Sequence, residues 1–135
     1  MRKFKALLLT ILVTTGMGLG LAAPAAAATN TKQSTCAWGI SWKYVKSTQE
    51  YTSTTVRPYY VEFTAGFPGT VKIHSWTVAL YVGGVWQTSA TWNEPDVTHS
   101  AHNWSAPTVG RDSTYVKFIL RDIAGDTCTK NVNIP

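Results

Sequence analysis

The sequence predicts an all-β protein, an immunoglobulin-like antiparallel β-sandwich stapled by one disulfide. Three observations support this class. Thr, Ser, Val and Tyr are abundant in the 135 residues, and these residue types favour strands. Several segments alternate apolar with polar residues and are separated by Gly or Pro turns. No segment has the spacing of a useful amphipathic helix, and an all-β domain of this size is usually a sandwich.

Residues 1–28 are predicted to be a secretion signal peptide. A basic start precedes an apolar run over residues 6–13, which continues more loosely to residue 23, and Ala26–Ala28 supply the small residues of a cleavage site. Cleavage before Thr29 leaves about 107 of the 135 residues. No later apolar stretch approaches the roughly 20 residues of a membrane span. We therefore expect a secreted, extracellular protein, and the Ala-rich cleavage region is bacterial in style.

The charge of the exported part argues against two classes of partner. The formal net charge of +5 includes three basic residues of the signal peptide, Arg2, Lys3 and Lys5. Without them, nine basic residues face seven acidic ones, a net charge of about +2 with no basic run. Binding to nucleic acid or to an anionic membrane therefore has little support.

Two cysteines, Cys36 and Cys128, stand near the ends of the exported part. Export favours an oxidised pair, which closes a loop of 92 residues. The chain-entropy model assigns such a loop about 4–5 kcal/mol of stabilisation. Two such distant cysteines lack metal-ligand spacing, so we expect a disulfide and no metal site.

The chain is expected to form a flexible tail at 29–35 and one β-sandwich domain at 36–135. The first predicted strand is 36–45, with Trp42 and Tyr44 on the same face as Cys36 and with Lys43 on the other. A second strand covers 56–65 and ends at the turn 67–69. Val71 and Ile73 are out of phase with Trp76, which predicts a bulge or break near residues 74–75.

The clearest hairpin spans residues 75–92. Gly83–Gly84 has the backbone freedom of a two-residue turn, which places Tyr81 opposite Trp86. Trp76 begins one face of this hairpin. Strict period two then gathers five residues on the face opposite Trp76: Tyr81, Trp86, Thr88, Ala90 and Trp92.

The C-terminal part is predicted to form another hairpin. A strand over 115–121 has Val116, Phe118 and Leu120 inward, and a loop over 122–126 leads into a strand over 127–134. The run 112–115 before this strand resembles the tyrosine corner of immunoglobulin-like sandwiches, with Tyr115 as its tyrosine.

Catalytic chemistry has little support in the sequence. The histidines His74, His99 and His102 are not accompanied by a nucleophile motif. Glu94 and Asp96 flank a proline in a predicted solvated loop rather than forming a paired-carboxylate site. We expect no catalytic residues, no cofactor and no metal.

Six tryptophans are many for one small core, because Trp is large and rarely buried completely. Strand phase assigns Trp38 and Trp76 to the core. The candidate ligand-binding residues are Trp42, Trp86, Trp92, Trp104 and Tyr81. For Trp42 the strand phase favours burial, so its role stays open. Sugar rings stack on flat aromatic faces, which makes a polysaccharide the leading ligand.

Three pieces of the chain carry a resemblance: Cys36 with Trp38-Gly39-Ile40-Ser41-Trp42, the run from Trp76 to Leu80 leading to Trp92, and Trp104 ahead of the strand at Tyr115. This pattern resembles the family 2 carbohydrate-binding modules of secreted bacterial cellulases and chitinases. The resemblance implies a sandwich whose ends are joined by a disulfide. It also implies a binding row of Trp42, Trp92 and Trp104, with Trp76 in the core.

A second, local resemblance concerns Trp42-Lys43-Tyr44, which follows a cysteine. It is similar to the Trp-Arg-Tyr segment of small secreted α-amylase inhibitors of actinomycetes, and it implies a hairpin tip that enters an amylase cleft. Lys is not equivalent to Arg where planar recognition matters.

The leading expectation is a secreted, non-catalytic, monomeric protein that binds polysaccharide through exposed tryptophans. One alternative is a proteinaceous inhibitor of an extracellular amylase or protease, with a protein as partner. Another is an exported toxin or bacteriocin, for which the sequence offers only size and export.

Overall fold

The computed structural model describes residues 26–135, so residues 1–25 of the predicted signal peptide lie outside the described part. All regular structure in the described part is β-strand. The strands are β1 (Ala28–Trp38), β2 (Ser41–Tyr51), β3 (Thr55–Phe67), β4 (Ile73–Val82), β5 (Val85–Val97), β6 (Ser100–Asn103), β7 (Val109–Gly110), β8 (Thr114–Asp122) and β9 (Thr127–Asn133). Residues 26–135 contain no helix long and apolar enough to cross a membrane.

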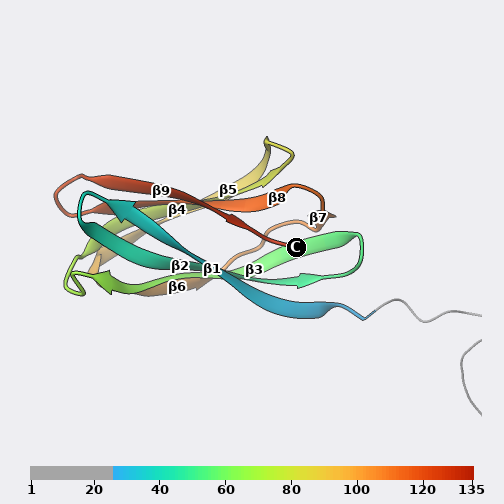
Figure 1. The fold of residues 1–135 in the computed structure, drawn as a ribbon, viewed down its shortest axis with the longest axis horizontal. Coiled ribbons are helices and arrows are strands. Elements are labelled where there is room, and N and C mark those ends of the chain that lie inside the picture. The colour runs from blue at the N-terminus through green and yellow to red at the C-terminus, as the bar shows by residue number, and fades with distance from the viewer. Residues whose placement is uncertain (1–25) are drawn as a thin grey trace, which may run out of the picture.

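The strands form two antiparallel sheets stacked as layers (Figure 1). Sheet A has the order β1-β2-β3-β6, with β7 also paired to β3, and sheet B has the order β5-β4-β8-β9. The chain crosses between the sheets after β3, after β5 and after β7, while β4–β5 and β8–β9 are hairpins within sheet B. The predicted all-β sandwich is confirmed.

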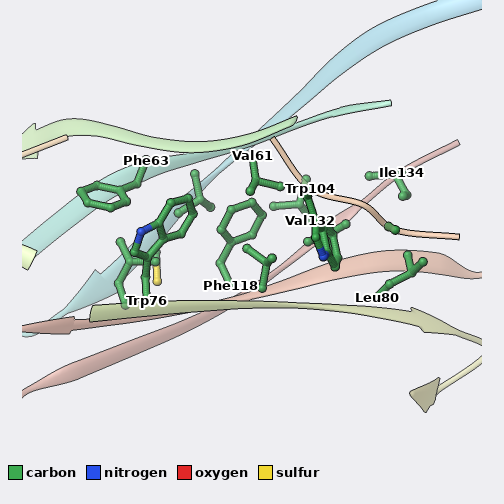
Figure 2. Close-up of a cluster of buried hydrophobic side chains, with 14 of the residues drawn as sticks. Val61, Phe63, Trp76, Leu80, Trp104, Phe118, Val132 and Ile134 are labelled. Atoms are coloured by element: carbon green, nitrogen blue, oxygen red, sulfur yellow. The ribbon is translucent and has the colours of Figure 1, made fainter. Parts of the chain in front are cut away.

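The inner faces of both sheets form one core (Figure 2). Trp76 of β4 is fully buried and packs edge-on against Phe63 of β3, with ring centroids 5.0 Å apart. Phe118 and Leu120 of β8 are also fully buried, as the alternation of the sequence predicts. The core therefore spans the two layers along most of their length.

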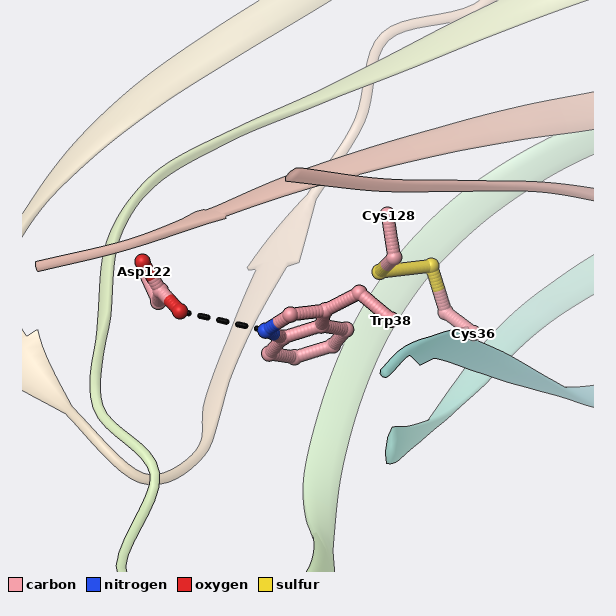
Figure 3. Close-up of a disulfide and its surroundings, with 4 residues drawn as sticks. All are labelled: Cys36, Trp38, Asp122 and Cys128. Atoms are coloured by element: carbon pink, nitrogen blue, oxygen red, sulfur yellow. Dashed lines mark hydrogen bonds between the residues drawn. A yellow bond between two sulfur atoms is a disulfide. The ribbon is translucent and has the colours of Figure 1, made fainter. Parts of the chain in front are cut away.

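The predicted disulfide between Cys36 and Cys128 is confirmed, and it joins β1 of sheet A to β9 of sheet B (Figure 3). Beside it, the indole Nε1 of Trp38 donates a hydrogen bond of 3.1 Å to Asp122 Oδ2. Trp38 is only partly buried and packs against the core. The disulfide and this bond fix the β1–β2 turn against the β8–β9 turn.

The N-terminal predictions need correction. Residues 29–35 are part of β1 and pair with β2, so the expected flexible tail is wrong for this segment. The expected strand 36–45 is broken by a turn at Gly39, whose φ of 57° suits glycine. The turn resets the alternation, so that Lys43 points into the core, and Trp42 and Tyr44 lie on the outer face of sheet A.

Of two further predictions for sheet B, one is confirmed and one is wrong. The expected irregularity near residues 74–75 is confirmed as a register shift between Ile73 and Ser75. The expected tyrosine corner is wrong, because Tyr115 faces outward. Its neighbour Thr114 is buried instead, and its hydroxyl donates a 2.7 Å hydrogen bond to the carbonyl of Gly110 upstream.

Candidate binding surface

Three aromatic side chains cross the outer face of sheet B on adjacent strands. Tyr81 of β4 pairs with Trp86 of β5 on one side and with Tyr115 of β8 on the other. Trp86 is 57% exposed, the most exposed ring of the three. We call Trp86, Tyr81 and Tyr115 the aromatic row. The predicted pairing of Tyr81 with Trp86 across the Gly83–Gly84 turn is confirmed.

The rings of the aromatic row do not form a flat platform. The Tyr81 and Tyr115 rings are nearly parallel, at 7°, with centroids 5.1 Å apart. Two coplanar rings this close would overlap, so the tyrosines must stack face to face and offset. The Nζ of Lys117 also lies 4.8 Å from the centroid of the Tyr81 ring. Trp86 is consequently the member of the row with the largest free surface.

A bulge in β5 determines which tryptophans join this row. Tyr81 pairs with Trp86 and Leu80 with Thr88, so Gln87 is an extra residue in the ladder. The alternation is reversed beyond it. Trp92 therefore pairs with Trp76 and lies on the inner side, where it is partly buried. The prediction that Trp92 shares a face with Trp86 is wrong for this reason.

Trp104 is also turned inward, in contrast to the expected exposure. It is 5% exposed and belongs to the core, beyond the end of β6 (Figure 2). Its backbone N–H donates to the carbonyl of Tyr59, which holds the segment against β3. The binding row of Trp42, Trp92 and Trp104 implied by the family resemblance is therefore not assembled on one surface.

Trp42 lies on the outer face of sheet A, on the opposite side of the sandwich from the aromatic row. It is partly exposed and meets Tyr44 edge-on at 5.0 Å. Between them, Lys43 is fully buried, and its Nζ donates a 2.7 Å hydrogen bond to the carbonyl of Thr98. Burial lowers the pKa of Lys43. Trp42-Lys43-Tyr44 therefore does not present its three side chains together at a hairpin tip.

A polar cluster that the sequence did not predict surrounds Glu94, between the free edges of the two sheets. Glu94 Oε2 accepts hydrogen bonds from Trp76 Nε1 at 2.7 Å and from Ser100 Oγ at 2.6 Å. His102 Nε2 lies 2.8 Å from the same oxygen, and the His102 ring stacks on Trp92. Burial acts to raise the pKa of Glu94, but the bonds from Ser100, Trp76 and His102 outweigh it and lower the pKa.

This cluster has a serine, a histidine and a carboxylate, but not the arrangement of a catalytic relay. In a relay, the serine hydroxyl bonds one imidazole nitrogen and the acid bonds the other. Here Ser100 donates to Glu94 itself, and the nitrogen of His102 that faces Glu94 is also the one that lies 3.4 Å from Ser100 Oγ. The arrangement suits a structural link between β5 and β6.

The remaining polar groups form no metal cluster in the described part of the chain. His74 bonds Asp96 at the surface, away from His102. A groove of about 590 Å³ lies beside the aromatic row, at the end marked by the Gly83–Gly84 turn. Tyr115 lines both the groove and the row. The outward position of Tyr115 follows from the inward phase of Val116 and Phe118, so strand alternation alone could have identified it.

No known family model, curated protein or solved structure matches this chain. The geometry and chemistry of the described surface therefore carry the functional proposal.

Proposed function

We propose that this chain is an exported, non-catalytic protein that binds polysaccharide on the outer face of sheet B. The single observation that carries the proposal is the aromatic row, in which an exposed Trp86 adjoins two tyrosines on consecutive strands. Export is supported by the signal-like residues 1–28 and by the Cys36–Cys128 disulfide, which suits an oxidising compartment.

The chemistry of the row suits a sugar. An indole face offers a large apolar surface on which the C–H face of a pyranose ring can stack. Tyr81 and Tyr115 are stacked on each other, so their phenol hydroxyls are better placed than their ring faces to meet a ligand. A row of this kind combines one stacking surface with hydrogen-bonding groups, as carbohydrate recognition requires.

Beyond the aromatic row, the inner strands of this face carry Ala79 and Ile119 as well as polar side chains, whereas the outer positions of the edge strands are polar. The outer positions on β5 are Ser89, Thr91 and Asn93, and those on β9 are threonine and asparagine. Thr77 of β4 and Thr91 of β5 bond each other through their hydroxyls. Val85 next to Trp86 is also exposed, at 63%, so the exposed apolar surface is local to this end of the face and small enough for a hydrated ligand surface.

A retention assay on insoluble glycans tests the proposal. Wild-type protein should be retained by at least one of cellulose, chitin and bacterial cell-wall material, and Trp86→Ala should lower the retained fraction at least tenfold. Phe67→Ala is the matched control, since Phe67 is 54% exposed compared with 57% for Trp86. Phe67 ends β3 near the start of β4, whereas Trp86 lies beside the turn at the other end of β4. The proposal fails if no glycan retains the wild type, or if the two variants behave alike.

A second candidate function, inhibition of an extracellular hydrolase, is favoured by one different observation. Three large apolar side chains are exposed on turns or at a strand end at the disulfide end of the sandwich, the left end in Figure 1: Ile40 at 81%, Ile123 at 63% and Phe67, the last residue of β3, at 54%. Ile40 also lines a groove with Trp38 and Asp122. Projecting loops with apolar tips suit insertion into a protein cleft.

The same two variants separate the candidates. An inhibitor acting through this end would reduce amylase or protease activity stoichiometrically, and Phe67→Ala would weaken that inhibition whereas Trp86→Ala would not. The opposite pattern, with glycan retention sensitive to Trp86 alone, supports the polysaccharide proposal.

A further inference from the structure

The groove beside Tyr115 is built from three segments that meet at one end of sheet B, at the right of Figure 1. These are the Gly83–Gly84 turn, residues 113–115 at the start of β8, and residues 133–134 at the end of β9. Backbone hydrogen bonds hold the segments together, from Gly83 N–H to the Ser113 carbonyl at 2.8 Å and from Ile134 N–H to the Thr114 carbonyl at 3.0 Å. The groove is therefore part of the folded framework.

The groove offers hydrogen-bonding groups beside Tyr115, and its Gly83–Gly84 side carries no side chains. Ser113 and Asn133 are exposed, and neither side chain forms a hydrogen bond to another described residue. Gly83 and Gly84 adopt φ values of 57° and 81°, a backbone conformation that favours glycine and leaves this side of the groove without side chains. A hydroxyl and an amide with free bonding capacity suit a ligand rich in hydroxyl groups.

The groove continues the aromatic row across the sheet. Asn133 of β9 pairs with Tyr115, which pairs with Tyr81, which pairs with Trp86. These four residues lie on four adjacent strands, so they span about 14 Å at the usual spacing between strands. A ligand that contacts all four must run perpendicular to the strands, from a stacking surface at Trp86 to a polar groove at Asn133.

The stacked tyrosines decide what kind of ligand fits. A crystalline polysaccharide presents a flat surface, which requires several coplanar rings facing outward. In this row the Tyr81 and Tyr115 rings lie against each other, and only Trp86 is more than half exposed. A single chain can instead place one ring on Trp86, meet the tyrosine hydroxyls, and turn a further sugar into the groove.

We infer that the ligand is a single, hydroxyl-rich glycan chain, soluble or amorphous, that runs from Trp86 across Tyr81 and Tyr115 into the groove at Ser113 and Asn133. This inference rests on the proposed function and adds the physical form and direction of the ligand. Asn133 and Ser113 bind and orient the chain end that leaves the aromatic row.

The experiment compares physical forms of the same polymer. Wild-type protein is tested on microcrystalline and acid-swollen cellulose, on crystalline and colloidal chitin, and in calorimetric titrations with cellohexaose and chitohexaose. We expect retention on the amorphous form at least tenfold above that on the crystalline form, together with measurable binding of the corresponding hexasaccharide.

Variants of the groove complete the test. Asn133→Ala and Ser113→Gly should each weaken hexasaccharide binding about fivefold or more, and glycine suits the φ of 54° at position 113. Asn93→Ala is the matched control, since Asn93 is exposed on β5 but lies at the far end of the same face. Circular dichroism checks that each variant folds.

The possible outcomes distinguish an error in the form of the ligand or in the groove from an error in polysaccharide binding itself. Retention that depends on Trp86 but is confined to crystalline polymer overturns this inference and leaves the proposed function standing. Hexasaccharide binding that responds equally to Asn133→Ala and Asn93→Ala also overturns the groove as a binding site. The absence of retention on every glycan overturns the proposed function and this inference together.

Discussion

The indole nitrogen of Trp76, a fully buried side chain, donates a 2.7 Å hydrogen bond to Glu94 Oε2. Trp76 lies on the inner strand β4, and Glu94 lies near the end of edge strand β5. Ser100 and His102 bring edge strand β6 of the other sheet to the same carboxylate. One side chain that is only 10% exposed thus connects the two sheets at the edges opposite the disulfide.

Replacing Glu94 should therefore destabilise the fold. Glu94→Ala leaves the Trp76 N–H and the Ser100 hydroxyl without their acceptor, and lost partners of this kind cost about 2–4 kcal/mol in total. Urea denaturation followed by tryptophan fluorescence measures the loss. His74→Ala, which removes the exposed His74–Asp96 pair, should cost about 0.5 kcal/mol or less. Equal losses in the two variants would contradict a structural role for Glu94.

The Glu94 carboxylate should also contribute to acid sensitivity. Its pKa in the folded protein is lowered from the ordinary value of 4.5, so the unfolded chain takes up its proton first as the pH falls. The stabilisation from the ionised Glu94 carboxylate is present above pH 4.5. It is lost progressively as the pH falls below 4.5 and past the lowered pKa of the folded protein. Denaturation midpoints measured between pH 7 and pH 3 should fall less steeply for Glu94→Gln than for the wild type. If the midpoints of the two proteins fall equally with pH, protonation of Glu94 is not coupled to unfolding.

Much of the fold follows from strand alternation and turn chemistry. The Gly83–Gly84 turn, the pairing of Tyr81 with Trp86 and the irregularity near Ser75 are all predicted from local sequence and confirmed. These features depend on neighbouring residues only. The Cys36–Cys128 disulfide is predicted from the number of cysteines and from export, and it is confirmed. That it joins the edge strands β1 and β9 is a finding of the structure.

The candidate site was harder to predict, because single-residue irregularities decide which ring faces outward. The extra residue Gln87 reverses the phase of β5 and sends Trp92 inward, yet nothing in its residue type marks a bulge. The turn at Gly39 similarly exchanges the faces of Trp42 and Lys43. The Glu94 cluster depends on a contact between two sheets, and no local pattern encodes such a contact.

Lys43 should give the protein a characteristic alkaline behaviour. Its ammonium is buried and bonds one carbonyl, and no carboxylate of the described residues forms an ion pair with it. Burial lowers its pKa from 10.5, so the folded protein loses the proton before the unfolded chain does. Burying the charged ammonium therefore destabilises the fold most below the lowered pKa, and this destabilisation decreases as the pH rises toward 10.5.

Comparison with Lys43→Met tests this behaviour. The free energy of unfolding of the wild type should rise relative to that of Lys43→Met between pH 7 and pH 10, as measured by urea denaturation at each pH. Methionine fills a similar volume and cannot titrate, so it isolates the ammonium. A difference between the two proteins that does not change with pH would contradict the prediction.

The disulfide should supply a large part of the stability. Cys36 and Cys128 are separated by 92 residues, and a loop of this length corresponds to about 4–5 kcal/mol in the chain-entropy model. The Cys36→Ser, Cys128→Ser double variant should lose stability of that order. Thermal unfolding of the wild type with and without reductant provides the second measurement. A decrease in the free energy of unfolding of less than about 1 kcal/mol would contradict the prediction, because it would mean that the disulfide does not stabilise the fold by restricting the unfolded chain.

Gly66 should be indispensable to the outer face of sheet A. A Cβ added there would lie 1.9 Å from the Trp42 carbonyl oxygen and 2.7 Å from its indole Cε3, so both the backbone and the ring would have to move. Gly66→Ala should therefore cost at least about 2–3 kcal/mol. Gly110→Ala is the matched control, because a Cβ at Gly110 meets nothing within 4 Å, and its cost should stay below about 1 kcal/mol.

Since Trp42 and the aromatic row lie on opposite faces, glycan retention by folded Gly66→Ala should equal that of the wild type. If Gly66→Ala is folded but is no longer retained by the glycan, the binding surface lies on sheet A instead.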